Sequence, residues 1–243
     1  MIGRFIFVRD KALGRRGKLV LAGLLLLALI VLLPLRLVLG WIAPAAVTAR
    51  SVEGAVWSGR IADLRVGPLP VGTVSAGLDV LPLMIGRGQL SVEREGPAPF
   101  AGKAYAGVGG TGLSSVSGVL PLPDGLGDLP ITSLGFDGFS MRFSAGQCAE
   151  VDGTVKLTLA SLGPLLPDAI ALSGKARCEN GKLVVPMRSA GGMETLTLRV
   201  GGDGRWQADL ALSGLPPEVS APLLQSGFAA RPGGIGIGTS GVF

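Results

Sequence analysis

The sequence predicts a mainly β protein, with one N-terminal transmembrane helix followed by an exported domain built on a curved, antiparallel β-sheet. Three observations predict this class. A charge-free apolar run occupies residues 19–35, polar and apolar residues alternate in short runs after residue 45, and Asp-Gly or Asn-Gly pairs stand between those runs. Hydrophobic residues make up 48% of the chain and charged residues 16%, a composition too apolar for a disordered protein.

Residues 19–41 are predicted to form the membrane anchor. The apolar run has 17 residues without a charge, and after Arg36 the apolar sequence continues to Trp41. At about 1.5 Å per residue, a helix of this length covers most of the roughly 30 Å hydrocarbon core. A cleaved signal peptide ending near residues 43–45 is the alternative. Secretory apolar regions are shorter, and a proline inside the cleavage triplet is unfavourable, so an uncleaved anchor is the better interpretation.

The formal net charge of +5 lies entirely in a basic segment, residues 1–18. This segment holds six basic residues and one acidic residue, whereas residues 19–243 hold sixteen of each. Arg15, Arg16 and Lys18 stand next to the apolar run, and such basic flanks keep the N-terminus in the cytoplasm while the chain beyond the helix is exported. The exported part has no surplus charge and few aromatic residues, so nucleic-acid binding is not expected.

Residues 45–226 are predicted to form the β domain, with about ten to twelve strands. Residues 154–159 and 195–200 alternate polar and apolar side chains, and this period of two is typical of antiparallel strands with one buried face. The pattern recurs at Trp206, Ala208, Leu210 and Leu212, and more weakly over residues 61–66, 73–80, 89–93, 113–120 and 139–143. The pairs at 152–153, 180–181 and 203–204 predict tight hairpin turns. Residues 162–170 and 217–225 could each form a short helical segment, and residues 227–243 are set apart as a Gly-rich tail.

A weak internal repeat contains both cysteines. Each copy has a strand, a cysteine, a Gly-containing turn and a second strand, at residues 144–155 and 173–183. Cys148 and Cys178 would therefore occupy equivalent places in neighbouring hairpins, where a disulfide between them is expected. Two buried free thiols are the alternative. A redox-active pair is disfavoured because there is no C-x-x-C motif.

The chain contains no histidine, which excludes His-dependent nucleophiles, His-ligated metals and imidazole acid–base chemistry. Two G-x-G-x-x-G matches, at residues 107–112 and 236–241, are expected by chance among 40 glycines, and neither is placed to open a helix. Glu93 and Glu95 share a strand face, which is more typical of a solvated surface than of a glycosidase pair. We therefore expect no enzymatic activity, no catalytic residue, no cofactor and no metal.

Several short motifs occur together in a familiar order. The basic segment and the single anchor precede a small-polar motif containing Gly54, Trp57, Ser58 and Gly59. They are followed by residues 146–148, 172–174 and 178–181 and two alternating strands. This arrangement resembles the type II secretion system protein N family, the N component of the general secretion pathway. The resemblance covers most of residues 1–215.

The resemblance implies a non-enzymatic, single-pass inner-membrane protein with its C-terminal domain in the periplasm. Such a protein would be an accessory component of the machinery that exports folded periplasmic proteins. The implied partners are the inner-membrane C, L and M proteins and the secretin. An alternative function of a different class is an AsmA-like anchored β-groove that binds or carries lipid, because amphipathic strands can curve into a trough with an apolar inner face.

Overall fold

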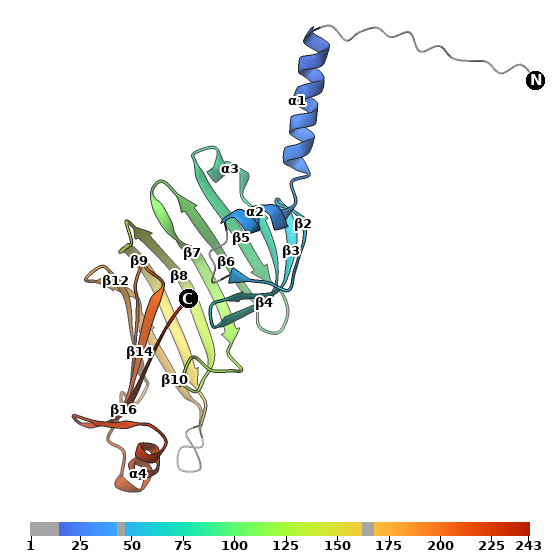
Figure 1. Cartoon of the computed structure of the whole chain (residues 1–243). Coiled ribbons are helices and arrows are strands. Elements are labelled where there is room, and N and C mark those ends of the chain that lie inside the picture. Colours follow the sequence, from blue (N-terminus) through green and yellow to red (C-terminus); the bar gives the residue numbers. More distant parts are fainter. Residues whose placement is uncertain (1–14, 43–46, 162–167) are drawn as a thin grey trace, which may run out of the picture.

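The computed structural model of the chain describes residues 15–42, 47–161 and 168–243, and the predicted mainly β, antiparallel class is confirmed. Within these ranges, sixteen strands form one sheet whose order follows the chain almost throughout (Figure 1). The helices are α1 (Arg15–Val31), α2 (Leu35–Ile42), α3 (Val80–Leu83) and α4 (Pro217–Gln225). The strands are β1 (Val47–Thr48), β2 (Ser51–Ala55), β3 (Ser58–Val66), β4 (Leu69–Leu78), β5 (Arg87–Arg94), β6 (Phe100–Gly107), β7 (Gly110–Pro121), β8 (Ile131–Ser144), β9 (Gln147–Leu159), β10 (Ile170–Lys175), β11 (Arg177–Glu179), β12 (Lys182–Ser189), β13 (Glu194–Val200), β14 (Arg205–Ser213), β15 (Ala229–Arg231) and β16 (Gly234–Val242).

The strand count exceeds the ten to twelve expected, partly because β1, β2, β11 and β15 have only two to five residues each. The predicted helical segment at residues 217–225 is confirmed as α4. Of the other segment expected to be helical, residues 162–167 lie outside the described residues, and Ile170 begins β10.

The apolar N-terminal segment forms two helices instead of the single helix expected over residues 19–41. Helix α1 ends at Val31, and α2 begins at Leu35. Pro34 lies between them, where it cannot donate a backbone hydrogen bond and where it disfavours helical geometry at the preceding residue. Helix α1 projects away from the sheet, whereas α2 lies beside β2 and β3 (Figure 1). Among the helices of the described residues, none is both long enough and apolar enough to cross a membrane.

Two of the three predicted turn dipeptides are confirmed as turns. Asn180-Gly181 joins β11 to β12, and Asp203-Gly204 lies between β13 and β14. The pair Asp152-Gly153 lies inside β9, so that hairpin prediction is wrong. Gly153 has a φ of +103° and lies opposite a β-bulge in β8, where residues 138–139 stand against Gly153 alone in the β8–β9 pairing. A glycine with positive φ suits a bulge as well as a turn, so the dipeptide alone does not distinguish the two.

Residues 227–243 are part of the sheet and not the separate tail that the sequence suggested. Strand β16 pairs with β14 along its whole length, from Gly234 opposite Ser213 to Val242 opposite Arg205. Glycine-rich composition concealed this strand, because glycines at alternate positions leave few side chains to show a period of two. Several of these glycines are needed for close packing: a Cβ on Gly241 would lie 2.9 Å from the Trp206 ring.

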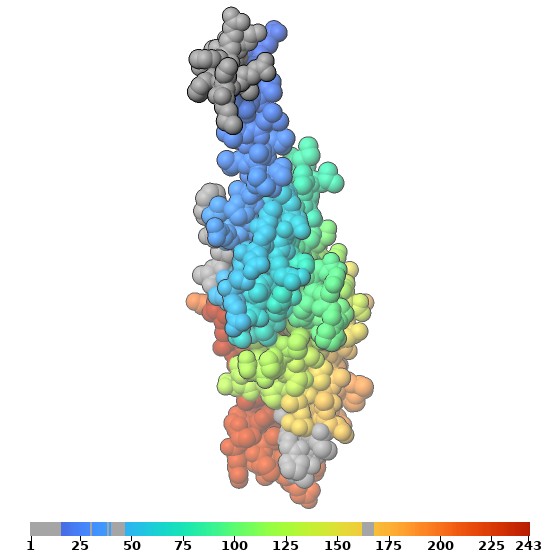
Figure 2. All heavy atoms as spheres, turned by 90° about the vertical axis from the view of Figure 1, so that its right-hand side faces the viewer, coloured from blue at the N-terminus to red at the C-terminus, as the bar shows by residue number. Residues whose placement is uncertain are grey.

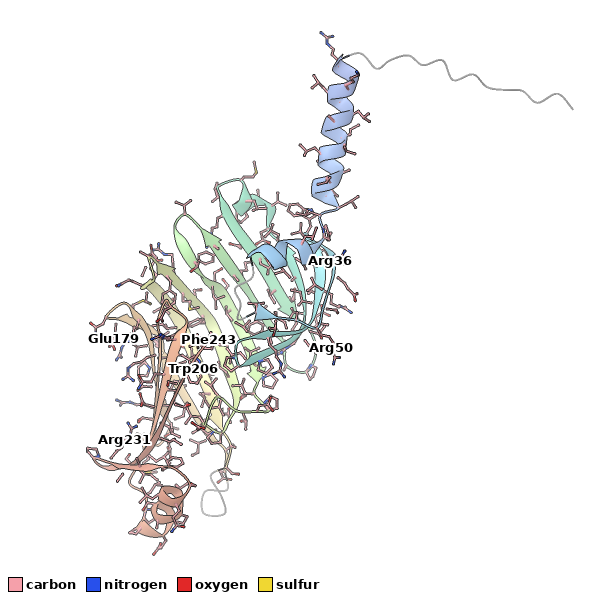
Figure 3. All side chains as sticks on the ribbon, in the orientation of Figure 1. Arg36, Arg50, Glu179, Trp206, Arg231 and Phe243 are labelled. Carbon is pink, nitrogen blue, oxygen red and sulfur yellow. A yellow bond between two sulfur atoms is a disulfide. The ribbon has the colours of Figure 1, made fainter. Side chains whose placement is uncertain are left out.

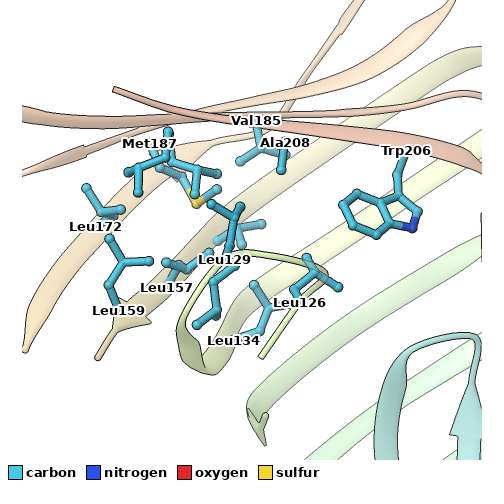
Figure 4. Close-up of a cluster of buried hydrophobic side chains, with 14 of the residues drawn as sticks. Leu126, Leu129, Leu134, Leu157, Leu159, Leu172, Val185, Met187, Trp206 and Ala208 are labelled. Atoms are coloured by element: carbon cyan, nitrogen blue, oxygen red, sulfur yellow. The ribbon is translucent and has the colours of Figure 1, made fainter. Parts of the chain in front are cut away.

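The sheet curls so that its C-terminal strands face its middle strands across the larger core. In Figure 4, Val185, Met187 and Ala208 point from one layer toward Leu157 and Leu159 of the other. The loop between β7 and β8 lies between these layers and contributes Leu122, Leu126 and Leu129, all buried. The predicted alternation in β14 is confirmed, with Trp206, Ala208, Leu210 and Leu212 all buried. The molecule is elongated, with α1 at one end and the α4 region at the other (Figure 2).

Candidate functional site

The family-like motif forms the turn of the β2–β3 hairpin, which holds the segment joining the two N-terminal helices. We call this contact the joint, defined as residues 33–35 together with residues 54–59. Val56 is at its centre, with 1% of its side chain exposed. Its N–H donates to the Leu33 carbonyl at 2.8 Å, and its own carbonyl accepts from the Leu78 N–H at 2.9 Å. The turn is therefore hydrogen-bonded on one side to the helix segment and on the other to the end of β4.

Two motif glycines are required by close approaches in the joint. Gly54 has a φ of +91°, and a Cβ there would lie 2.7 Å from the Ser58 carbonyl oxygen. A Cβ on Gly59 would lie 2.5 Å from Leu35 Cδ2 and 2.7 Å from the Glu53 carbonyl oxygen. Real Cβ atoms do not approach other atoms this closely. A side chain at Gly54 would therefore distort the hairpin itself, and one at Gly59 would push the helix segment from the hairpin.

The other two motif residues have different positions in the same turn. Trp57 is half-buried, and a Cβ on Gly77 would lie only 2.5 Å from the Trp57 carbonyl oxygen. Ser58 is exposed and pairs with Ala55 at the start of β3. Backbone packing at the joint thus explains the two glycines of the motif.

Leu35 connects the joint to the smaller of the two hydrophobic cores. It is 1% exposed and belongs to a cluster of buried side chains from α2, the hairpin turn, β3, β4 and β7. The members of this cluster are Leu35, Val56, Ile61, Leu64, Val71, Val74, Ala76 and Leu120. Because the first residue of α2 is fully buried in the core of the β domain, the helix segment is held to the sheet by packing as well as by hydrogen bonds.

Helix α1 has apolar side chains on all its faces, and they are exposed. Leu19, Leu21, Leu25 and Leu29 each have between 59% and 69% of their surface exposed. A helix that is apolar all round is normally buried in a core or in a lipid bilayer. Arg15, Arg16 and Lys18 lie in its first turn, where positive charge opposes the helix dipole.

Cys148 and Cys178 form a disulfide, which confirms the pairing expected from the repeat. Their Cα atoms are 5.6 Å apart. The Cys148 N–H also donates to the Gly181 carbonyl at 2.8 Å, so the β8–β9 and β11–β12 hairpins are joined by a hydrogen bond beside the covalent link. The disulfide therefore links β9 to β11, which pairs with β12.

The remaining candidate chemical motifs are explained by the sheet. Residues 107–112 span the end of β6, the turn at residues 108–109 and the start of β7, and residues 236–241 lie inside β16, so neither opens a helix that could hold a phosphate. Glu93 lies in β5 opposite Ala101. No group of three or more carboxylate or cysteine side chains that could hold a metal occurs among residues 15–42, 47–161 and 168–243.

Arg94 has a structural role that the sequence did not reveal. Its guanidinium donates to the carbonyl oxygens of Val71, Ala98 and Val119, at 2.5, 2.9 and 2.6 Å. Burial of the side chain lowers its pKa, and the three carbonyls supply the partners that a buried charge needs. A single arginine thus joins β4, the β5–β6 turn and β7.

Comparison with known families assigns the chain. The pattern of the family described as type II secretion system (T2SS), protein N, matches residues 45–238, which is most of the chain. The chain belongs to the type II secretion system protein N family. No curated protein and no solved structure matches it.

Membership of the type II secretion protein N family makes the chain a component of a protein secretion machinery and associates it with the cell envelope. The matched residues begin after the two helices and include the hairpin turn, both cysteines and most of β16. The family match thus extends into residues 227–238, which the sequence had set apart as a tail.

Proposed function

We propose that this type II secretion protein N is a non-enzymatic, inner-membrane-anchored accessory component that assists export of folded periplasmic proteins. The family match over residues 45–238 is the observation that carries the proposal. Its proposed organisation has a basic cytoplasmic segment at residues 1–18, an anchor within residues 19–41 and a periplasmic β domain.

Helix α1 supports the anchor. Its apolar side chains are exposed in every direction, which is stable only if an apolar medium surrounds them. The basic residues of its first turn would oppose the helix dipole, so their placement fits a signal for cytoplasmic retention better than helix stabilisation. The disulfide agrees with an oxidising compartment for the β domain.

The anchor is short. The part of α1 within the proposed anchor, residues 19–31, has 13 residues and spans about 20 Å, against roughly 30 Å for the hydrocarbon core. A short span is accommodated by local thinning of the bilayer and by long basic side chains that reach the headgroups, here Arg16 and Lys18. The membrane surface would then lie close to Leu32–Pro34 and therefore close to the joint.

The joint gives the domain its mechanical role in this proposal. Since Leu35 is buried in the core of the β domain, a membrane-held α1 would present the sheet at a fixed height and orientation. A subunit that organises other components needs such a defined orientation. The proposed partners are the inner-membrane C, L and M proteins and the secretin.

The proposal is tested by secretion in the native host. Deletion of the gene should lower the amount of secreted substrate in the medium and raise it in the periplasm, and the wild-type gene should restore export. Crosslinking in intact cells should recover at least one of the C, L or M proteins or the secretin. Full export without the gene, together with no crosslinked secretion subunit, would contradict the proposal. The gene is also expected to lie among secretin and pseudopilin genes.

A separate fusion experiment tests the topology. Alkaline phosphatase fused after Val47 should be active, because the enzyme folds only after export to an oxidising compartment. A fusion after Arg16 is the control and should be inactive. An inactive fusion after Val47 would overturn the proposed orientation.

The AsmA-like alternative requires an open apolar trough for lipid. In the larger core, the space between the layers is filled by Leu126 and Leu129 of the β7–β8 loop (Figure 4). Two surface hollows, of about 460 and 330 Å³, are lined largely by polar, charged and loop residues. Phospholipid retained at fixed stoichiometry after detergent extraction and gel filtration would favour this alternative over the accessory role.

A further inference from the structure

The connection between β4 and β5 ends in an exposed apolar cluster, which we call the apolar tip, residues 80–86. Leu81, Met84 and Ile85 are 79%, 80% and 80% exposed, and no residue of α3 is buried. Residues 80–86 carry no charged side chain. Connections between antiparallel strands are usually short and polar, so an apolar connection of this length without a single buried residue in α3 needs a separate explanation.

The apolar tip lies at the end of the sheet to which α1 is attached. The register of β3 with β4 puts Gly59 opposite Ala76, so the hairpin turn and the end of β4 share that end. The Val56 carbonyl accepts from the Leu78 N–H, two residues before the tip begins. Figures 1 and 2, which differ by a quarter turn, both show the tip reaching the level of the sheet-proximal part of α1.

A second exposed apolar side chain occurs at the same end. Val108, in the β6–β7 turn, is fully exposed. The pairing of β5 with β6, from Arg87 opposite Gly107, brings this turn beside the base of the tip. Three other turns, Ala145-Gly146, Asn180-Gly181 and Asp203-Gly204, carry small or polar residues. Met193, in the turn from β12 to β13, is 50% exposed, but it is less exposed than Leu81, Met84, Ile85 and Val108, which lie next to α1.

The base of the apolar tip is held rigidly and carries polar and basic groups. The Asp79 carboxylate accepts from Gln89 Nε2 at 2.6 Å, Ser91 Oγ at 3.0 Å and Lys103 Nζ at 3.1 Å. The Arg87 guanidinium stacks on the Tyr105 ring, 3.6 Å from its centroid. Apolar side chains followed by a tyrosine and basic residues are the sequence of groups found from the membrane interior to the headgroup layer.

We propose that the apolar tip and Val108 enter the interfacial layer of the bilayer that holds α1, so that the β domain rests on the membrane at two places. The inference rests on the proposed anchor. With a short α1 and only residues 32–34 between it and the buried Leu35, the domain end nearest α1 must lie at the membrane surface. A tip at the level of α1 then meets lipid. Burial of Leu81, Met84 and Ile85 in lipid accounts for their exposure in the isolated chain.

Spin labels on the full chain test the inference. The sequence has two cysteines, and both are in the disulfide, so an added cysteine can be labelled selectively. Three variants are compared in phosphatidylethanolamine–phosphatidylglycerol vesicles: Ile85→Cys for the tip, Leu25→Cys for α1, and Leu224→Cys as the control. Leu224 is an exposed leucine of α4, at the end of the molecule far from α1 (Figure 1). Collisions with oxygen report lipid, and collisions with a water-soluble nickel chelate report water.

We expect the labels at residues 25 and 85 to collide mainly with oxygen and the label at residue 224 to collide mainly with the nickel chelate. Nickel collisions should be several-fold fewer at residue 85 than at residue 224. If residue 25 is in lipid while residue 85 resembles residue 224, the tip inference is overturned and the anchor stands. If residue 25 is in water, the anchor fails and the tip inference fails with it, because no bilayer then holds α1.

A second measurement uses the combined variant Leu81→Ser, Met84→Ser and Ile85→Ser with a label at Val108→Cys. None of the three substituted residues is buried, so thermal unfolding should be unchanged. The label should move from lipid toward water, because the tip no longer holds this end of the sheet at the membrane. The matched control, Met193→Ser with Leu224→Ser, should leave the label where it was. Equal label environments in the two variants would overturn the inference.

Discussion

Gly59 and Leu35 are in contact where the N-terminal helix segment meets the β-hairpin, and a Cβ on Gly59 would lie 2.5 Å from Leu35 Cδ2. Gly59 belongs to the motif that resembles the family, and Leu35 lies at the end of the apolar run that resembles a membrane anchor. The contact therefore joins the two parts of the chain that the sequence suggested separately.

Substitution Gly59→Ala is expected to destabilise the protein by about 1–3 kcal/mol, because the added methyl group overpacks the joint against Leu35 and the Glu53 carbonyl. Thermal unfolding in detergent measures the effect. The matched control is Gly88→Ala in β5, where the nearest atom to a new Cβ is 3.7 Å away. Equal stability losses in the two variants would show that the joint is not tightly packed.

Removal of the disulfide by Cys148→Ser with Cys178→Ser should lower stability by about 3–4 kcal/mol, because a loop of 30 residues is no longer closed in the unfolded chain. Urea unfolding with and without reductant measures this. The wild type should shift to a lower midpoint on reduction, and the double variant should not respond. If full reduction of the wild type left its urea midpoint unchanged, the expected contribution of the disulfide to stability would be contradicted.

The Trp206 and Phe243 rings lie 6.0 Å apart between centroids, and the Phe243 N–H donates to the Gly204 carbonyl (Figure 3). Substitution Phe243→Ala should cost about 1–3 kcal/mol and reduce the near-ultraviolet dichroism of tryptophan, since an aromatic contact and apolar burial are lost. The neighbouring Val242→Ala is the control. Val242 is 63% exposed, so its truncation should change the unfolding midpoint very little.

The hydrogen bond from Gln89 lowers the pKa of Asp79, with further lowering by Lys103 and Ser91 against the effect of burial. Because the pKa is lower in the folded state, this carboxylate stabilises the fold above its unfolded pKa of about 4. The contribution is lost as the pH falls from there through the folded value. The stability difference between wild type and Asp79→Asn should therefore be constant from about pH 6 to 8 and should shrink below about pH 4.

Urea midpoints measured across that pH range provide the check for Asp79. The control is Asp63→Asn, which removes an exposed pair with Arg50 and should cost little at any pH. A difference for Asp79→Asn that grows on acidification would have the wrong sign and would contradict the assignment.

The sequence by itself determined the class of fold, the disulfide and the family. Strands such as β9 and β14 alternate in the sequence because one face is buried, and tight turns such as Asn180-Gly181 need residues that tolerate positive φ. These signals are local, so they can be read without a structure. The equivalent places of the two cysteines in a repeat gave the one long-range contact that the sequence indicated.

Only the tertiary structure decided how the parts fit together. Residues 35–42 read as the continuation of an apolar helix, but the buried site for Leu35 is built by β3, β4 and the hairpin turn, which are distant in sequence. Residues 234–242 carry glycine at alternate positions instead of the usual polar residue, and these glycines pack against backbone and rings of β14. The β8 bulge opposite Gly153, the three-carbonyl site of Arg94 and the shared end of α1 and the apolar tip likewise depend on which strands become neighbours. Local side-chain pattern cannot encode that choice, because strand pairing is fixed by contacts between distant segments.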